Sequence, residues 1–168
     1  INPSNENEVY FLVANQTEGI GKECKNYLGE AEWNGLWKYT YQNGDGTGSG
    51  GSWIDLSSNL YVGPGMFDEF NVQGGYDLTI AIKPNAPNVI FIGGTNLYRS
   101  TDGFTTPDNV QQVGGYDIGT ELPLFNSYPN HHPDQHALVF LPSNPDILFS
   151  LSDGGIARTD NCLAETID

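Results

Sequence analysis

Residues 83–92, KPNAPNVIFI, begin with a proline-asparagine turn and end in a short apolar strand. The phrase has two counterparts in the chain, NPSN at 2–5 before VYFLV at 9–13, and LPSNPDILFS at 141–150. Self-similarity on this scale is typical of repeat architectures. We therefore interpret the phrase as the landmark of a structural unit that occurs three times.

Each unit contains short runs rich in β-branched and aromatic residues, bounded by Gly, Pro, Asn or Asp, and such runs predict strands. Aligning the units on the proline turn predicts an innermost strand before the turn, a second strand after it, a third with one basic residue, and an outer fourth. These strands are expected at 77–82 and 136–141 (innermost), 9–13, 89–92 and 147–150 (second), 36–40, 97–101 and 156–159 (third), and 52–56 and 110–113 (fourth).

Four antiparallel strands per unit make the blade of a β-propeller, so the sequence predicts an all-β fold of this kind with about three blades. The first unit lacks an innermost strand and the third lacks an outer one. We therefore expect a fragment of a larger propeller, whose remainder would be a partner of this chain. The expected divisions are 1–58, an incomplete blade with long insertions; 59–115, a complete blade; and 116–168, a loop followed by an incomplete blade.

The composition excludes several classes of partner. The chain of 168 residues has 21 Asp and Glu against 6 Lys and Arg, which gives a net charge of −15. Nucleic acids and anionic membrane surfaces need a basic face, which this composition does not provide. No apolar run is long enough for a membrane span, so membrane insertion is not expected. Cys24 and Cys162 fit neither a metal nor a redox spacing, and both free thiols and a disulfide remain open.

The third strand of the second unit runs into STDGF at 100–104, which resembles a degenerate Asp-box turn. Together with TDN at 159–161, HPDQHAL at 132–138 and SDGG at 152–155, this makes the chain similar to sortilin-type and BNR-repeat β-propellers. Many of these are large exported proteins of Bacteroidetes linked to type IX secretion. The resemblance implies an extracellular or cell-surface location, and it implies that Asp102 forms a turn by accepting backbone N–H bonds.

All three histidines of the chain fall within NHHPDQH at 130–136, directly before an innermost strand. Side chains alternate along an extended segment, so we expect His132, Asp134 and His136 to share a face. Imidazole and carboxylate groups suit a divalent metal or acid-base chemistry. Hydrogen bonding to neighbouring backbone is the alternative, and no cofactor is predicted.

The matching position in the second unit is GGYD at 74–77. Registering the units on their prolines predicts that Tyr76 and Asp77 lie beside Asp134 and His136 at the mouth of the propeller channel. We expect the ligand-binding residues to be Tyr76, Asp77, His132, Asp134 and His136. Asp77, Asp134 and His136 are the candidates for catalysis, since a pair of carboxylates is what a glycosidase needs. Turns that satisfy the backbone use the same residue types.

Three functions are compatible with these patterns. The leading hypothesis is a ligand-binding or scaffolding propeller segment, whose ligand is a carbohydrate or a peptide. The alternatives are a glycoside hydrolase and a purely structural module of an adhesin or secretion complex. Carboxyls facing an open groove would favour hydrolysis, whereas buried carboxyls saturated by backbone N–H groups would favour the structural role. The acidic segment 66–71 is expected in a loop, and Trp37 and Trp53 are expected in the core.

Overall fold

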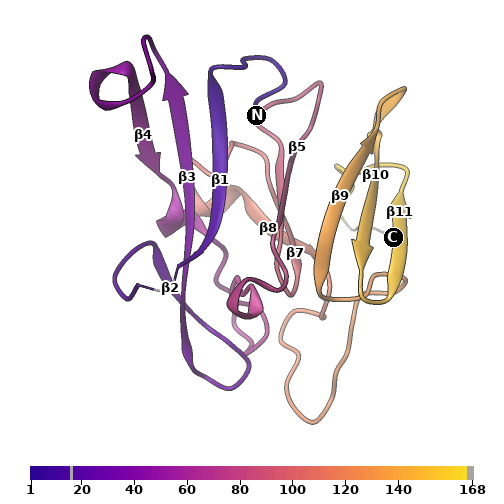
Figure 1. Cartoon of the computed structure of the whole chain (residues 1–168). Coiled ribbons are helices and arrows are strands. Elements are labelled where there is room, and N and C mark those ends of the chain that lie inside the picture. The colour runs from indigo at the N-terminus through magenta and orange to yellow at the C-terminus, as the bar shows by residue number, and fades with distance from the viewer. Residues whose placement is uncertain (16, 166–168) are drawn as a thin grey trace.

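The computed structural model describes residues 1–15 and 17–165, which form three antiparallel sheets in succession along the chain (Figure 1). Within these residues the only helical elements are four single 3-10 turns, η1 to η4, at Gly48–Gly50, Ser57–Asn59, Gln73–Gly75 and Pro107–Asn109. Over the same residues, no helix has the length and apolarity needed to cross a membrane. The prediction of an all-β chain built from antiparallel sheets is therefore confirmed.

The first sheet is built around one long strand, β3 (Ala31–Tyr41). Strand β1 (Glu8–Asn15) pairs along one side of β3, while β2 (Lys22–Lys25) and β4 (Gly51–Asp55) share the other side. Strand β2 was not predicted, because it lies in one of the long insertions expected in the first unit. Its short KECK pattern alternates, and it buries Cys24 completely while its neighbours stay accessible.

The second sheet has the four strands expected, in the order β5-β6-β7-β8. The third sheet has three, in the order β11-β10-β9. Proline turns join β5 to β6 and β9 to β10, as the repeat predicts. The bounds of these strands are Thr79–Ile82 (β5), Ile90–Gly93 (β6), Leu97–Ser100 (β7), Val110–Gly114 (β8), Gln135–Leu141 (β9), Asn144–Ser152 (β10) and Gly155–Thr159 (β11).

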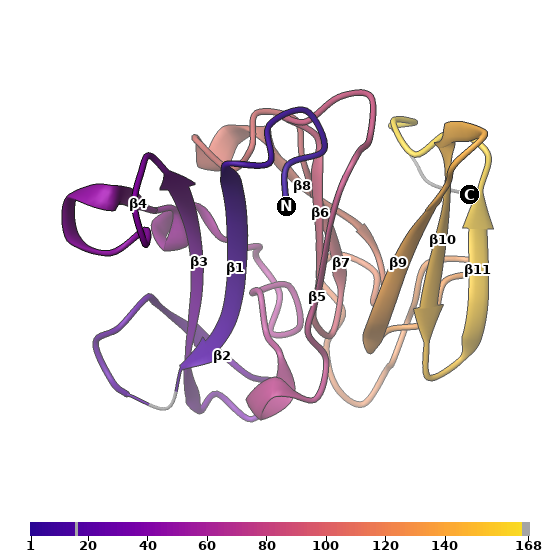
Figure 2. The ribbon, with the colours of Figure 1, turned by 45° about the horizontal axis from the view of Figure 1, so that its top comes forward.

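The second sheet lies between the other two and is covered on both faces (Figure 2). Along β6, Ile90 and Ile92 belong to a core shared with Leu36 of the first sheet, whereas Phe91 belongs to a core shared with Leu148 of the third. This is the period-two alternation of a strand with apolar neighbours on both sides. Every residue of β6 and β7 is buried as a result.

None of the described residues covers the outward faces of the first and third sheets, which carry large apolar side chains. Trp53 is 60% exposed and contacts the rings of Phe11 and Tyr39, at centroid distances of 5.3 and 4.9 Å. Its prediction as a core residue was wrong, because it lies on the face of the first sheet that points away from the second. On the third sheet, Val139 and Ile156 are 51% and 73% exposed.

The turn between β7 and β8 is organised by Asp102, as the Asp-box resemblance implied. Its carboxylate accepts hydrogen bonds from the backbone N–H groups of Thr105 and Thr106, at 3.2 and 3.0 Å. Side chains of Ser100 and Asn109 donate to the same carboxylate at 2.9 and 3.1 Å. The role of Asp102 as a turn-former is therefore confirmed.

The two cysteines belong to different hydrophobic cores and do not form a disulfide with each other. Cys24 and Cys162 are both free thiols and both fully buried. Of the two states that the sequence left open, the structure has the reduced one.

Candidate functional site

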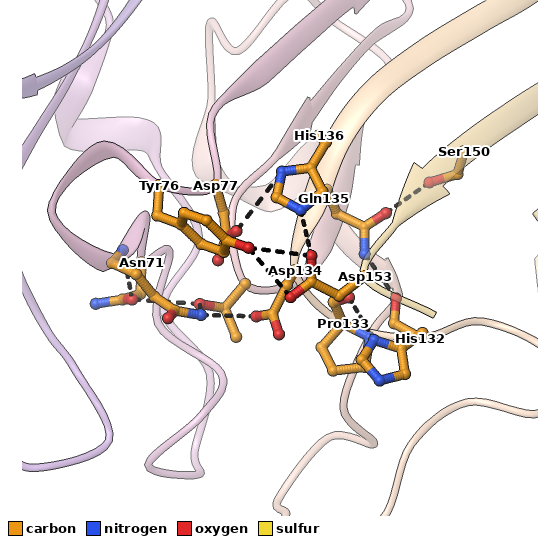
Figure 3. A network of polar contacts seen from close by, with 12 residues as sticks. Asn71, Tyr76, Asp77, His132, Pro133, Asp134, Gln135, His136, Ser150 and Asp153 are labelled. Atoms are coloured by element: carbon orange, nitrogen blue, oxygen red, sulfur yellow. Dashed lines mark hydrogen bonds and ion pairs between the residues drawn. The ribbon is translucent and has the colours of Figure 1, made fainter. Parts of the chain in front are cut away.

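The predicted site residues come together where the second and third sheets meet, at the entrances of β5 and β9 (Figure 3). Backbone hydrogen bonds fix this junction. Asp134 N–H donates to the carbonyl of Thr95 at 2.8 Å, and Thr95 N–H donates to the carbonyl of Asn71 at 2.8 Å. The approach requires Gly94, since a Cβ there would lie 2.1 Å from the Asn71 carbonyl oxygen. Three segments distant in sequence are thus held side by side.

The segment before β9 is not extended, although the sequence suggested that it would be. Asn130 and Asp134 adopt φ values of 59° and 67°, and β9 begins at Gln135, one residue before the predicted start. Non-glycine residues rarely adopt this left-handed conformation, and it removes the alternation on which a common face depended. Gln135 is buried and fixes the bend, because its Nε2 donates to the His132 carbonyl at 2.7 Å.

His132 lies apart from the other candidates. Its Nδ1 is 2.8 Å from the carbonyl oxygen of Pro133, and Figure 3 shows the ring turned away from His136. Among residues 1–15 and 17–165, no group of three or more His, Cys, Asp or Glu side chains is arranged to hold a metal ion. The candidate metal set of His132, Asp134 and His136 is therefore not assembled as a ligand group.

Asp77 is the most unusual side chain of the site. Its exposed fraction is 0%, and its carboxylate accepts no hydrogen bond from an N–H or hydroxyl group among the described residues, which leaves the Asp134 carboxyl as its hydrogen-bonding neighbour. The imidazole of His136 lies beside the same carboxylate, with Nδ1 4.0 Å from Oδ1 of Asp77. Burial, together with the neighbouring Asp134 carboxyl, raises the pKa of Asp77 to about 7. This carboxyl therefore holds its proton up to neutral pH.

His136 bridges Asp77 to a second carboxylate, Asp153. The His136 Nε2 lies 2.5 Å from Oδ1 of Asp153, and the Tyr76 hydroxyl donates to the same carboxylate at 3.3 Å. The Tyr76 and His136 rings meet edge to face with centroids 5.1 Å apart. The hydrogen bond from His136 lowers the pKa of Asp153. Two acids with opposite pKa shifts therefore flank one imidazole.

The sequence did not identify Asp153 as part of the site. It lies in the β10–β11 turn and returns to His136 because Ser152 pairs with Gln135 across the sheet. The SDGG stretch at 152–155 was noted only as part of the family resemblance. Hairpin geometry would have placed it beside the start of β9.

Asp134 connects this cluster to a pocket. Gln73 donates from Nε2 to Oδ1 of Asp134 at 2.6 Å, and Gln73 itself has a left-handed φ of 48°. Burial raises the pKa of Asp134, and the Asp153 charge adds to that rise. Gln73 and Asp134 are thus two non-glycine residues with a left-handed backbone that contact each other in space. Backbone strain of this kind is often found at functional sites.

The pocket beside Asp134 has a volume of about 260 Å³ and one aromatic wall. Phe67 lies at its centre, and its ring contacts those of Tyr27, Tyr116 and Phe125, at 6.0, 4.7 and 5.8 Å between centroids. The predicted acidic segment 66–71 divides between two environments. Its Met66, Phe67, Glu69 and Asn71 line the pocket, whereas Asp68 and Phe70 are fully buried.

Polar side chains also line the pocket, and one of them has an unsatisfied donor. Asn71 is only 6% exposed, and its Nδ2 has no hydrogen-bond partner among the described residues. Asp134 and Gln73 also line the pocket. A buried amide donor without an acceptor is costly, so a ligand oxygen would relieve the cost. Tyr27, Tyr116 and Phe125 were not predicted, because they come from loops with no strand pattern.

The sequence left two arrangements of the carboxyls open: carboxyls that face an open groove, or buried carboxyls saturated by backbone N–H groups. The geometry of Asp77 matches neither. Asp77 does not face an open groove, as direct participation in hydrolysis requires. It also receives no backbone N–H bond, as a purely turn-forming role requires. Comparison with protein-family models, curated proteins and solved structures gave no match for this chain.

Proposed function

We propose that the chain forms three consecutive blades of a β-propeller in an exported protein, with the carbohydrate-binding pocket beside Asp134 as its site. Three observations support the propeller. Successive sheets stack face to face, β5 and β9 pack against each other, and the β7–β8 turn has the hydrogen bonds of an Asp-box. Export rests on the family resemblance alone.

The uncovered faces of the outer sheets support further blades on both sides. A sheet needs its apolar face covered, and Trp53 and Ile156 are 60% and 73% exposed on the two outward faces. The partner that fits both faces is a sheet packed as the second sheet packs on the first. In this proposal the remainder of the propeller supplies it.

The unsatisfied amide of Asn71 is the observation that favours a carbohydrate at the pocket. A sugar hydroxyl is both donor and acceptor, so it can accept from Asn71 Nδ2 and donate to the Asp134 carboxylate. The apolar face of a sugar ring can pack on the aromatic wall around Phe67. A cavity of about 260 Å³ is on the scale of one sugar ring rather than of a folded peptide.

Binding of soluble polysaccharides tests this proposal. Xyloglucan, mixed-linkage glucan and chitin oligosaccharides are the probes, screened by affinity electrophoresis and then by titration calorimetry. Phe125 lines the pocket and is 60% exposed, so Phe125→Ala should leave the fold intact while weakening binding about tenfold. Leu124→Ala is the matched control, since Leu124 is 64% exposed and does not line the pocket.

The control should change affinity less than twofold. Failure of every probe to bind, or equal weakening by both variants, would contradict the proposal. Reducing ends released from a bound polysaccharide would instead favour the hydrolase alternative. We expect retention without release, because Asp77 has no exposed surface with which to contact a substrate.

A further inference from the structure

A second cavity lies between the second and third sheets, which face each other across it (Figure 2). It has a volume of about 190 Å³, and in the described part of the chain it shares no lining residue with the pocket beside Asp134. Its chemistry must therefore be considered on its own. The side chains that matter below are Leu97 of β7, Leu148 and Ser150 of β10, Ala157 of β11, and His131 of the loop before β9.

Strand alternation brings the side chains of the third sheet to this cavity. Leu148 and Ser150 pair with Thr159 and Ala157 across β10 and β11, so all four side chains lie on one face of the sheet. Leu148 packs in the same core as Leu97, which shows that this face points toward the second sheet. The residues that alternate with them on β11 have their side chains on the outward face and contribute only main chain to the cavity.

The internal repeat explains why a cavity exists here. Aligning the proline turns places Ser150 at the position of Ile92, and Ala157 pairs with Ser150 as Tyr98 pairs with Ile92. Ile92 and Tyr98 are both fully buried in the core between the first and second sheets. Two small side chains therefore replace two large ones, and the equivalent space between the second and third sheets stays unfilled.

Tyr98 shows what the equivalent space accommodates. Its ring packs against those of Tyr61 and Phe70, with centroids 5.3 and 5.6 Å apart. Its hydroxyl donates to the Asp68 carbonyl at 3.1 Å and accepts from Asn96 Nδ2 at 3.4 Å. Between the first two sheets, the position thus holds a phenol whose hydroxyl is both a donor and an acceptor.

His131 brings an unused donor to the cavity. The residue is only 7% exposed, and its Nδ1 accepts a hydrogen bond from the Gly115 N–H at 3.0 Å. Burial lowers the pKa of His131 to about 4, so the neutral imidazole carries its proton on Nε2. This Nε2 is buried and has no partner among the described residues. A buried N–H without an acceptor is costly, and a ligand oxygen would relieve the cost.

Ser150 offers the complementary acceptor. Its hydroxyl donates to Oε1 of Gln135 at 2.5 Å, so its proton is already used while its lone pairs remain available (Figure 3). Leu97 and Leu148 supply apolar wall. Water would satisfy the two polar groups but would leave the apolar part of the cavity without contacts. One donor, one acceptor and an apolar wall together favour an aromatic ring that carries a hydroxyl.

The size of the cavity fits one such ring. An engineered apolar cavity of about 150 Å³ admits benzene, and this cavity has about 190 Å³. We propose that the cavity between the second and third sheets binds a small neutral phenol, whose hydroxyl accepts from His131 Nε2 and donates to Ser150 Oγ. The phenol takes the place that the Tyr98 side chain fills in the preceding interface. This site is independent of the carbohydrate pocket.

Nuclear magnetic resonance titration with p-cresol, which is the tyrosine side chain in isolation, tests the proposal. The methyl signals of Leu97, Leu148 and Ala157 should shift and saturate, with a Kd of about 1 mM or tighter. Toluene has the same shape without the hydroxyl, and should bind at least about threefold more weakly. A purely apolar cavity would show the reverse preference, because it would desolvate the hydroxyl without a partner.

Filling the cavity provides the matched pair of variants. Ala157→Tyr places the equivalent of Tyr98 in the cavity and should abolish p-cresol binding. Ile156→Tyr is the control, since it adds the same side chain at the next position, on the outward face, where Ile156 is 73% exposed. The control should change the affinity less than about twofold.

His131→Asn isolates the hydrogen bond and decides the matter if Ala157→Tyr does not fold. The Asn side chain can keep an acceptor for the Gly115 N–H, but it removes the Nε2 donor. It should weaken p-cresol binding roughly threefold to tenfold and leave toluene binding unchanged. N-acetyltyrosinamide separates the two sources of a phenol: its binding indicates a tyrosine side chain, whereas binding of p-cresol alone indicates a free phenol.

Three results would overturn the proposal: no saturable p-cresol binding, toluene binding as tight as that of p-cresol, or p-cresol binding that persists in folded Ala157→Tyr. Polysaccharide binding by Ala157→Tyr, and p-cresol binding by Phe125→Ala, should both be unchanged, because the two cavities share no lining residue in the described chain. The two proposals therefore fail separately.

Discussion

Two aspartates beside strands of the second sheet have opposite surroundings. Asp102 follows β7 and accepts hydrogen bonds from two backbone N–H groups and several side chains. Partial burial alone would raise the pKa of Asp102, but these donors outweigh it and hold the pKa well below its usual range. Asp77 precedes β5, accepts no hydrogen bond from an N–H or hydroxyl group of the described residues, and has its pKa raised to about 7.

The difference separates a structural carboxylate from a candidate functional one. A carboxylate that organises a turn is surrounded by donors, which make its ionised form stable. A buried carboxyl without donors costs stability whenever it ionises, so the fold gains nothing from Asp77 as a turn residue. Its neighbours Asp134 and His136 belong to the same site, so a role in that site accounts for the buried Asp77 carboxyl. Burial and missing partners, not residue type, identify the site.

Replacing the structural aspartate should have the largest effect. Asp102→Ala leaves the N–H groups of Thr105 and Thr106 without their acceptor, and should lower the free energy of unfolding by about 3 kcal/mol. Urea unfolding followed by circular dichroism measures this. Asp108→Ala in the same turn is the control, since Asp108 is exposed and should change stability by less than about 0.5 kcal/mol. Equal losses of stability in the two variants would show that Asp102 supports the turn no more than the exposed Asp108 does.

Asp77→Asn should have an effect that depends on pH. The folded protein binds the Asp77 proton more tightly than the unfolded chain, so ionisation lowers stability as pH rises from about 4 to 7. The variant lacks this loss. Relative to the wild type, it should gain about 3 kcal/mol between pH 4.5 and pH 8, at up to about 1.4 kcal/mol per pH unit. A difference that does not vary with pH would contradict the account.

His131 should oppose Asp77 over part of that range. Burial lowers the pKa of His131 to about 4, so the folded state keeps it neutral where the unfolded chain takes up a proton. Its contribution is complete above about pH 6.5 and is lost as pH falls toward 4. Stability of Asp77→Asn should therefore rise from pH 4.5 to 6.5 by about 1–2 kcal/mol, and His131→Asn added to it should flatten that rise. If adding His131→Asn leaves the slope of stability against pH unchanged, the lowered pKa of His131 does not cause the rise.

Tyr76→Phe should have the smallest effect. Tyr76 is 60% exposed, and its hydroxyl makes long bonds of 3.3 and 3.4 Å to Asp153. Its removal should change the free energy of unfolding by less than about 0.5 kcal/mol. Nuclear magnetic resonance should show the His136 ring still bonded to Asp153. A larger loss would mean that the exposed and buried halves of the cluster are coupled.

The repeat predicted the sheets well because strand alternation and turn residues are local signals. It also placed Asp77 beside His136, since both lie at equivalent strand entrances. It failed where long-range geometry decides the outcome. Trp53 looks like core in sequence but lies on an uncovered face, and Asp153 reaches the site only through a hairpin. The left-handed φ of Asp134 could not be anticipated, because no glycine marks it.

The most direct test is a carbon-13 carboxyl titration of the wild-type protein that follows Asp77 and Asp102 in one experiment. The account predicts a midpoint of about 7 for Asp77, while Asp102 stays ionised over the whole range from pH 3 to 8. A midpoint for Asp77 near 4, or the two carboxyls titrating together, would show that Asp77 is as well satisfied as Asp102 and would contradict the account.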